Sequence, residues 1–225
     1  MTILGLDSSA VSASCAVVDK ELGKIKAYGS VNVKITHSQT LLPLAENILK
    51  AAKLSLHDID AFAVSNGPGS FTGLRISVSA VKGMAFALNK PVCGVSTLLA
   101  LAYNLLGRDA IACCVMDARR GEVYNALFDV CGGNVERLTP DRAISLAELG
   151  GELSQLTEKE IVFVGDGAEL AHDYFEETCS IAPEITRYQN AASVCFAADE
   201  SEFVPAKKLM PVYIRKPQAE RERRP

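Results

Sequence analysis

The decisive stretch of this sequence reads Asn66-Gly67-Pro68-Gly69-Ser70-Phe71-Thr72-Gly73-Leu74-Arg75. It lies between a predicted buried strand, Ala61–Ser65, and a predicted helix from about Phe71 to Leu88. Glycine accepts positive φ angles and close backbone contacts, and a helix N-terminus presents unpaired N–H groups. The stretch therefore predicts one of two structures: a turn that binds a phosphate, or a tight turn that starts a helix.

Composition narrows the function classes. The chain has 225 residues, of which 48% are hydrophobic and 22% charged, and this is typical of a globular protein with a core of its own. A net charge of −4 argues against a nucleic-acid binder that acts alone. The charge is uneven, because residues 215–225 hold five Lys or Arg against two Glu. We expect this basic tail to be solvated or, alternatively, to contact a partner or an RNA.

The cysteines and the N-terminus point to a reducing compartment. Seven cysteines form no C-x-x-C pair, which favours reduced thiols over a disulfide framework. The first residues lead directly into a strand, without the basic and apolar regions of a signal peptide. No apolar run is expected to span a membrane. The predicted location is the cytoplasm.

A supersecondary unit repeats along the chain. Thr2–Asp7 is an apolar strand that ends in aspartate, and Ile111–Asp117 repeats this pattern 110 positions later. Each is followed by a turn and a returning strand, which predicts two lobes of similar topology. The remaining predicted strands are Ser12–Val18, Lys24–Val33, Val92–Val95, Glu122–Val130 and Ile161–Val164, with an extended terminus at Pro211–Arg215. The remaining predicted helices are Ser38–Lys53, Ser96–Leu106, Leu146–Leu156, a helix that ends near Thr178, and residues 191–198.

Few residues have the spacing of a catalytic site. Asp7 and Asp117 follow strands, where each could hold a metal–phosphate or, alternatively, cap its own turn through backbone N–H groups. The glycine stretch has no lysine at the P-loop position, and Gly165-Asp166-Gly167 is only a short candidate phosphate turn. The three histidines form no helical pair, and no serine completes a nucleophile elbow or a triad.

Several segments resemble one family closely. They are Ile3-Leu4-Gly5-Leu6-Asp7-Ser8-Ser9, His37-Ser38-Gln39-Thr40-Leu41-Leu42-Pro43, Gly67–Arg75, Met116–Tyr124 and Pro211–Arg215. In this order they resemble the TsaB (YeaZ) family, and the resemblance covers nearly the whole chain. TsaB is the bacterial partner subunit in making threonylcarbamoyladenosine (t6A) on tRNA.

The resemblance implies an α/β actin-like ATPase (ASKHA) fold with two lobes of mixed β-sheet flanked by helices. We assign residues 1–106 to an N-terminal, partner-docking lobe, 107–214 to a C-terminal lobe and 215–225 to a flexible basic tail. The resemblance also implies partners: TsaB pairs with its catalytic paralogue TsaD, and the ATPase TsaE joins them. TsaD transfers a threonylcarbamoyl group to the adenosine beside the anticodon, so this chain would contact tRNA only as part of the complex.

The resemblance further implies that this chain has lost a metal site. TsaD carries two helical histidines four residues apart, and the matching positions here are Thr97 and Leu101. Neither side chain replaces an imidazole on a transition metal. No cofactor is expected, and any ATP or ADP would bind weakly, in the interlobe cleft or at the complex interface. The weak candidate residues for it are Asp7, Gly67, Gly69, Gly165 and Asp166.

Two helices are predicted to form the partner interface. In the family's heterodimer the N-terminal-lobe helices pack together, and here these are residues 38–53 and 71–88. Both carry apolar residues beyond one core-facing stripe, including Leu42, Ile76 and Met84. Alternatively, these lie beneath other helices of the same lobe. The predicted interface residues are His37, Leu41, Leu42, Ala45, Arg75, Val78, Ser79 and Lys82, and the same face would form a homodimer in the isolated subunit.

Three functions compete at this point. In the first, this chain is a scaffold and activator of the tRNA-modifying transferase and is not itself an enzyme. The second is a nucleotide-dependent phosphotransferase or ATPase that uses Asp7 or Asp117 with Mg²⁺. The third, a peptidase, lacks a metal pair or a triad in the sequence.

Overall fold

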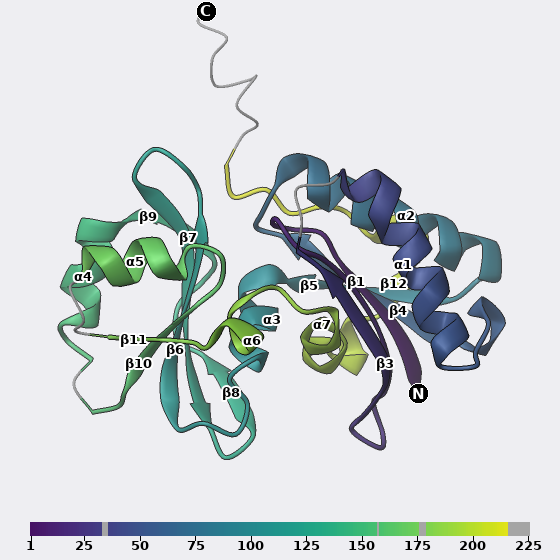
Figure 1. Cartoon of the computed structure of the whole chain (residues 1–225), viewed down its shortest axis with the longest axis horizontal. Coiled ribbons are helices and arrows are strands. Elements are labelled where there is room, and N and C mark those ends of the chain that lie inside the picture. Colours follow the sequence, from purple (N-terminus) through teal and green to yellow (C-terminus); the bar gives the residue numbers. More distant parts are fainter. Residues whose placement is uncertain (33–35, 157, 176–178, 216–225) are drawn as a thin grey trace, which may run out of the picture.

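The computed structural model describes residues 1–32, 36–156, 158–175 and 179–215. Three predicted features lie outside this described part: the end of a strand at Val33, the end of a helix near Thr178, and residues 216–225 of the tail. The chain forms two six-stranded mixed sheets side by side, each flanked by helices (Figure 1). The strand order is β12-β5-β4-β1-β2-β3 in the first sheet and β11-β10-β6-β7-β8 in the second, where β9 also pairs with β7.

The strands and helices have the following bounds. The first sheet contains β1 (Thr2–Asp7), β2 (Ala13–Asp19), β3 (Lys24–Val31), β4 (Ala61–Gly67), β5 (Pro91–Ser96) and β12 (Val204–Pro205). The second contains β6 (Ala110–Asp117), β7 (Glu122–Cys131), β8 (Asn134–Arg137), β9 (Arg142–Ser145), β10 (Ile161–Val164) and β11 (Ser180–Ile181). The helices are α1 (His37–Ala51), α2 (Phe71–Leu88), α3 (Thr97–Tyr103), α4 (Leu146–Leu153), α5 (Ala168–Tyr174), α6 (Glu184–Arg187) and α7 (Ala191–Ala197). Short 3-10 turns are η1 (Leu56–Asp58), η2 (Glu200–Glu202) and η3 (Ala206–Lys208).

The predicted internal repeat is confirmed. Strand β1 pairs antiparallel with β2 and parallel with β4, and β6 pairs in the same way with β7 and β10. Asp7 and Asp117 occupy equivalent places at the ends of β1 and β6. The two lobes therefore present matching strand ends and turns to the space between them.

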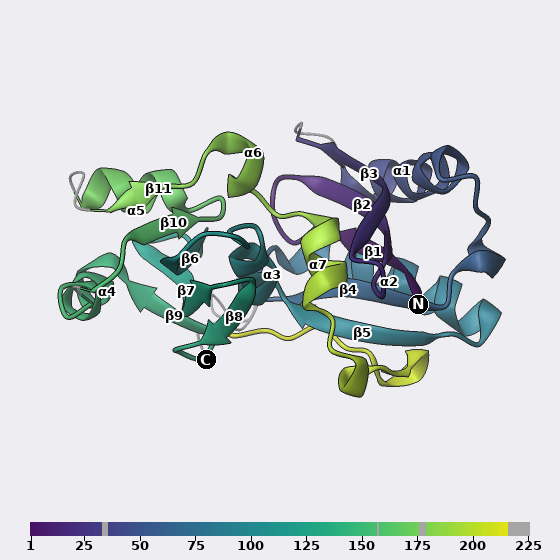
Figure 2. The ribbon, with the colours of Figure 1, turned by 90° about the horizontal axis from the view of Figure 1, so that it is seen from below.

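Helices cover both faces of each sheet, and the central strands are therefore buried on both sides. In the first sheet, alternate residues of β1 and β4 face α1 and α2 in one core and α7 in another. In the second sheet, β6 faces α4 and α5 on one side and α3 on the other. Helices α3 and α7 pack against each other and so form the layer between the two sheets (Figure 2).

The lobe boundary differs from the sequence prediction, which assigned 107–214 to the second lobe. Helix α7 packs on β1, β2 and β4, and β12 pairs with β5, so residues 191–209 belong to the first lobe. Gly5 makes this packing possible, since a Cβ there would lie 2.4 Å from Cys195 Sγ and 2.6 Å from the Ala191 carbonyl oxygen. The chain thus returns to its first lobe after completing the second.

Helix α2 begins and ends on identifiable signals. The Ser70 hydroxyl accepts a hydrogen bond from the Gly73 N–H (3.3 Å), and Asn89 closes the helix with a left-handed φ of 51°. By length and composition α2 could cross a membrane, which the sequence analysis did not anticipate. Its buried residues, which include Leu74 and Val81, pack on the first sheet, so α2 is a core helix here.

Candidate functional site

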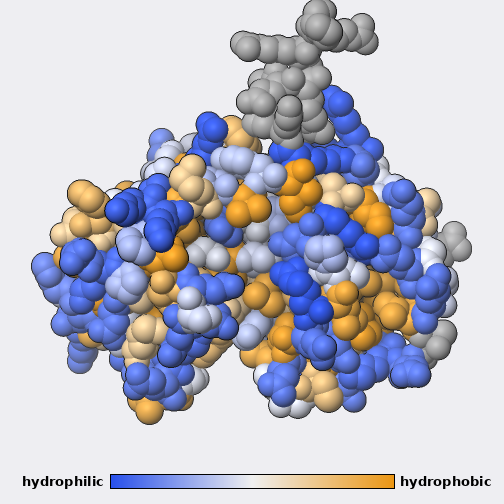
Figure 3. Space-filling model, turned by 180° about the vertical axis from the view of Figure 1, so that it is seen from behind, coloured by the Kyte–Doolittle hydropathy of each residue, from blue (hydrophilic) through white to orange (hydrophobic). Residues whose placement is uncertain are grey.

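A pocket of about 460 Å³ lies between the lobes. The first lobe contributes the β1–β2 turn, the loop after β4 and the first turn of α2. The second lobe contributes the β6–β7 turn and Asp166. An extended segment, Pro211–Arg215, crosses from one lobe to the other and lines the pocket as well; we name it the strap. A notch separates the lobes at the end of the molecule opposite the strap (Figure 3).

Asp7 is buried behind the pocket and is 1% exposed. Its Oδ1 accepts hydrogen bonds from the backbone N–H and the hydroxyl of Ser9, each at 2.8 Å. Its other oxygen accepts from the Ser65 hydroxyl. Burial raises the pKa of Asp7, and these hydrogen bonds act in the opposite direction. The geometry is that of a carboxylate that caps its own turn.

Asp117 has the equivalent role in the second lobe. It is exposed at the pocket wall, and its Oδ1 accepts the Arg119 N–H at 2.6 Å. Arg119 adopts a left-handed φ of 63°, as residues in such turns do. The turn-capping alternative therefore describes the contacts of both aspartates.

The glycine loop is held between two other backbone segments. Gly69 has a φ of 156°, and a Cβ there would lie 2.4 Å from the Ser9 carbonyl oxygen, which accepts the Ser70 N–H. A Cβ on Gly67 would lie 2.1 Å from the carbonyl oxygen of Val212 in the strap. These two glycines permit close backbone packing, which supports a tight turn that starts a helix.

The sequence predicted that the strap is extended, but not that it lines the site. The ring of Tyr213 lies 4.7 Å from that of Phe71, and its hydroxyl accepts from Arg75 Nε at 3.1 Å. Arg215 donates to the Ala118 carbonyl at 3.2 Å and pairs with Glu122. The strap therefore connects α2 of the first lobe to the β6–β7 turn of the second. Only the tertiary contacts show that this extended segment joins the two lobes.

Asp166 is a half-buried carboxyl group in the pocket lining. Gly165 precedes it with a φ of 116°, where a Cβ would meet the Val115 carbonyl oxygen at 2.1 Å. Gln189 Nε2 donates to Asp166 Oδ1 at 2.9 Å. Burial is the main cause that raises the pKa of Asp166 to about 6, with small contributions from Asp117 and Asp7.

The substitution Asp166→Asn is expected to stabilise the protein at neutral pH. A carboxyl group with a raised pKa holds its proton more tightly when folded, so folding stability falls as pH rises from about 4 to about 6. The asparagine side chain would keep an acceptor for Gln189 and carry no charge, which should add about 1–3 kcal/mol above pH 6. Urea unfolding at pH 4.5 and pH 7.5 measures this. An equal effect of the substitution at the two pH values would contradict it.

The charged side chains that line the pocket are of both signs. The described residues that line it include no lysine, and its charged side chains are Asp117, Asp166, Arg119 and Arg215. Arg215 is already engaged by the Ala118 carbonyl and Glu122. The lining side chains therefore provide no excess of positive charge for a polyphosphate. Among the described residues no group of three His, Cys, Asp or Glu side chains is placed to hold a metal ion.

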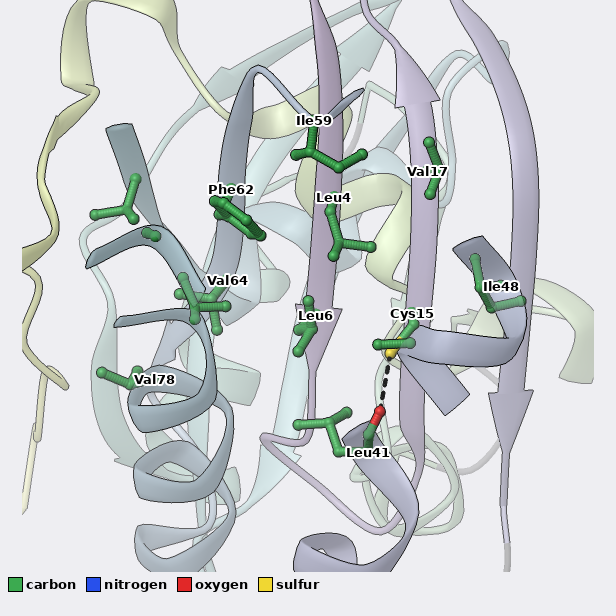
Figure 4. Packing of buried hydrophobic residues seen from close by; sticks show 14 of the residues in the cluster. Leu4, Leu6, Cys15, Val17, Leu41, Ile48, Ile59, Phe62, Val64 and Val78 are labelled. Carbon is green, nitrogen blue, oxygen red and sulfur yellow. Dashed lines mark hydrogen bonds between the residues drawn. The ribbon is translucent and has the colours of Figure 1, made fainter. Parts of the chain in front are cut away.

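Three predicted interface residues are core residues instead. Leu41, Ala45 and Val78 are 1%, 2% and 3% exposed and pack on the first sheet beside Leu6 and Val64 (Figure 4). The prediction was wrong for these three because an apolar helical stripe does not reveal whether the chain's own sheet covers it. A partner cannot reach them.

The other predicted interface residues lie at or near the surface. Leu42 is 50% exposed, and Arg75 and Ser79 are exposed on α2. His37 Nε2 donates to the Ala10 carbonyl at 2.8 Å and thus fixes the start of α1 to the β1–β2 turn. Lys82 is half-buried and donates to the Leu209 carbonyl at 2.9 Å. The half-buried apolar residues near this face are Leu44, Ile76, Ala80 and Met84.

The positions matched to the histidines of TsaD lie inside α3. Thr97 and Leu101 are 0% and 1% exposed, in the helix layer between the sheets. The Thr97 hydroxyl has no hydrogen-bond partner in the described part of the chain. Neither side chain supplies a metal ligand in this buried setting.

Comparison with known proteins identifies the family. A family model described as TsaD: tRNA N6-adenosine threonylcarbamoyltransferase matches residues 30–222. The tRNA threonylcarbamoyladenosine biosynthesis protein TsaB of Bacillus subtilis (strain 168) is 30% identical, over 98% of this chain and 96% of the relative. The chain belongs to the TsaB family. TsaB of Escherichia coli (strain K12) is also 30% identical, over 96% of this chain and 95% of its own length.

Solved structures support the same architecture. YeaZ from Pseudomonas aeruginosa superposes with a TM-score of 0.78 at 26% identity, over 94% of this chain and 100% of that one. The ethanolamine utilization protein EutJ from Carboxydothermus hydrogenoformans has a TM-score of 0.52 at 10% identity, over 88% and 90% of the two chains, and so shares only the fold. The expected actin-like fold, shared by TsaB family members, is confirmed.

Proposed function

We propose that this chain is a non-catalytic scaffold and activator subunit in threonylcarbamoyladenosine modification of tRNA. The observation that carries the proposal is the similarity to TsaB, which extends across both lobes in two relatives. The match to the TsaD family model supports common ancestry with a transferase. The buried Thr97 and Leu101, in place of histidines, support a lobe that no longer has the metal site.

The proposed partner is a catalytic paralogue of the TsaD type, with the ATPase TsaE joining the pair in the cytoplasm. The docking surface would be the outer face of α1 and α2, with Leu42 at its centre and the half-buried Ile76, Ala80 and Met84 beside it. A partly apolar helical face of this kind suits packing against two helices of a partner. In the isolated subunit the same face would support a symmetric homodimer.

Reconstituted tRNA modification tests the scaffold proposal. We expect threonylcarbamoyladenosine to form when TsaD, TsaE, the activated threonylcarbamoyl donor and this chain are combined with tRNA. Omission of this chain should reduce the yield by at least about 100-fold, since an activating subunit acts on nearly every turnover. Mass spectrometry of digested tRNA measures the product. Equal yields with and without the chain would disprove the proposal.

The competing phosphotransferase function rests on the interlobe pocket. If Asp7 or Asp117 served catalysis there, the pure chain would hydrolyse ATP, and Asp7→Asn or Asp117→Asn would abolish turnover. The scaffold proposal expects no hydrolysis above background from the pure chain. Turnover that disappears in either variant would establish the competing function.

A further inference from the structure

The strap is fixed to the first lobe along most of its length. The Val212 N–H donates to the Asn66 carbonyl at 2.7 Å, which adds a backbone hydrogen bond near the end of β4. Just before the strap, the Leu209 carbonyl accepts from Lys82 Nζ at 2.9 Å. The Tyr213 ring packs on the first turn of α2. These contacts make most of the strap a part of the first lobe.

Arg215, the last residue of the strap, holds the second lobe. Its guanidinium donates to the Ala118 carbonyl at 3.2 Å and pairs with Glu122, so it bridges the two ends of the β6–β7 turn. The Glu122 side chain is 38% exposed. Water and salt therefore compete for this ion pair more than they would for a buried one. The contact between strap and second lobe can thus break without exposing a hydrophobic core.

The turn that Arg215 holds has a strained backbone. Arg119 and Arg120 adopt left-handed φ angles of 63° and 59°. Two successive non-glycine residues rarely adopt this conformation, and it persists only where the surroundings fix it. Asp117 Oδ1 accepts the Arg119 N–H, and Arg215 donates to the Ala118 carbonyl, so both contacts help to fix the turn. Loss of the Arg215 contact is therefore expected to let the turn relax.

The chain also crosses between the lobes after α3 and again before α7. Asn104 joins these two crossings, because its Nδ2 donates to the Tyr188 carbonyl at 2.8 Å and its Oδ1 accepts from the Ser193 hydroxyl at 2.6 Å. Helix α3 packs against the pocket residues Ala10 and Met116 from the core side. In Figure 1 the strap crosses at the top, and the layer of α3 and α7 lies below it. Rotation about this layer would separate the lobes at the strap.

We propose that the strap is a latch, meaning a releasable tie, between the two lobes. With Arg215 bound to the β6–β7 turn, the lobes stay at the angle of the present structure. When this contact breaks, the strap stays on the first lobe, the lobes rotate apart about the α3–α7 layer, and the interlobe pocket opens. Val212 and Tyr213 line that pocket, so release of the latch also controls access to it. The latch acts within one chain and therefore does not depend on which partner the chain binds.

Interlobe distances in the isolated chain test this proposal. One nitroxide spin label is attached to Cys131, which is exposed on the second lobe, and another to Leu22→Cys on the β2–β3 hairpin, where Leu22 is 74% exposed. Cys179 is replaced by serine, and the other five cysteines are buried. Labelled chains are diluted with unlabelled ones, so that the dipolar signal reports distances within one chain. Glu122→Gln and Arg215→Gln, each measured alone, should shift and broaden the distance distribution.

Hydrogen exchange shows which end of the strap is released. In Glu122→Gln the Ala118 amide, which donates to the Glu122 carbonyl within the turn, should exchange about 10- to 100-fold faster, as expected for loss of a hydrogen bond to a charged group. The Val212 amide should keep its wild-type rate, because the strap stays on the first lobe.

Glu46→Gln is the matched control, since it removes a carboxylate from the exposed ion pair with Lys50 within α1. It should change neither the distances nor the exchange rates. A wild-type distance distribution in both Glu122→Gln and Arg215→Gln would overturn the proposal, because other contacts would then hold the lobes. Equal acceleration of the Ala118 and Val212 amides would also overturn it, since the strap would then leave both lobes together.

Discussion

Replacing Gly73 with alanine is expected to destabilise the protein by about 3 kcal/mol or more. A Cβ on Gly73 would lie 1.9 Å from the Ser8 carbonyl oxygen, where real Cβ atoms are not found. The obstacle is backbone, and the Ser8 hydroxyl also donates to the Gly73 carbonyl at 2.9 Å, so neither segment can move aside alone. Forced separation of α2 from the β1–β2 turn costs packing energy. Urea unfolding followed by circular dichroism measures the change.

Gly83→Ala is the control within the same helix. Apart from the two neighbouring residues and the helix's own backbone, no atom of the described residues lies within 4 Å of a Cβ at Gly83, which is exposed in the middle of α2. Alanine there should stabilise the protein by about 0.5–1 kcal/mol, because it restricts the unfolded chain and favours helix. The two substitutions therefore have opposite expected signs. An unfolding midpoint for Gly73→Ala equal to that of the wild type would show that α2 does not contact Ser8.

Gly73 illustrates what the sequence could predict. The run of glycines before an apolar helix correctly predicted a turn and the bounds Phe71–Leu88 of α2. It did not distinguish a phosphate turn from a packing turn, because both need glycine for the same steric reason. The distinction came from Ser9 and Val212, whose carbonyl oxygens occupy the space beside the loop. Those contacts join residues far apart in sequence.

The strand–aspartate repeat was predictable for a related reason. Period-2 apolar strands followed by turn residues give a strong local signal, and β1, β2, β6 and β7 were all correctly expected. Strands β8 and β9 were missed because four residues each are too short to show a period. The return of α7 and β12 to the first lobe was missed because a seven-residue apolar helix does not indicate which sheet will cover it.

The candidate site was only partly predictable. Asp7, Asp117 and Asp166 were named from their turns, and the structure brings Asp117 and Asp166 to one pocket. The sequence predicted an extended segment at Pro211–Arg215 but not its place in the pocket, since Tyr213 and Arg215 act through contacts with Phe71 and Glu122. The local sequence thus identified the turns at the pocket, whereas the role of the strap in the pocket could be seen only in the tertiary structure.

Adjacent leucines on α1 provide the second large prediction, with opposite outcomes. Leu41→Asp is expected to unfold the protein or to lower the free energy of unfolding by about 4 kcal/mol or more. Leu41 is 1% exposed, and its described neighbours in the core are apolar, so a carboxylate there would have no cation beside it (Figure 4). Leu42→Asp should change the free energy of unfolding by less than about 1 kcal/mol, since Leu42 is 50% exposed. Thermal and urea unfolding of both variants measures this difference.

The same pair separates folding from partner docking. If α1 and α2 dock the catalytic paralogue, Leu42→Asp should weaken the complex by about 10- to 100-fold while the isolated chain stays folded. Calorimetric titration with TsaD measures the affinity, and Asn47→Asp, which adds the same charge at an exposed position on α1, tests whether charge alone causes the loss. Unchanged affinity in Leu42→Asp would exclude this face as the docking surface. A folded Leu41→Asp with a wild-type midpoint would contradict the packing of α1 on the first sheet.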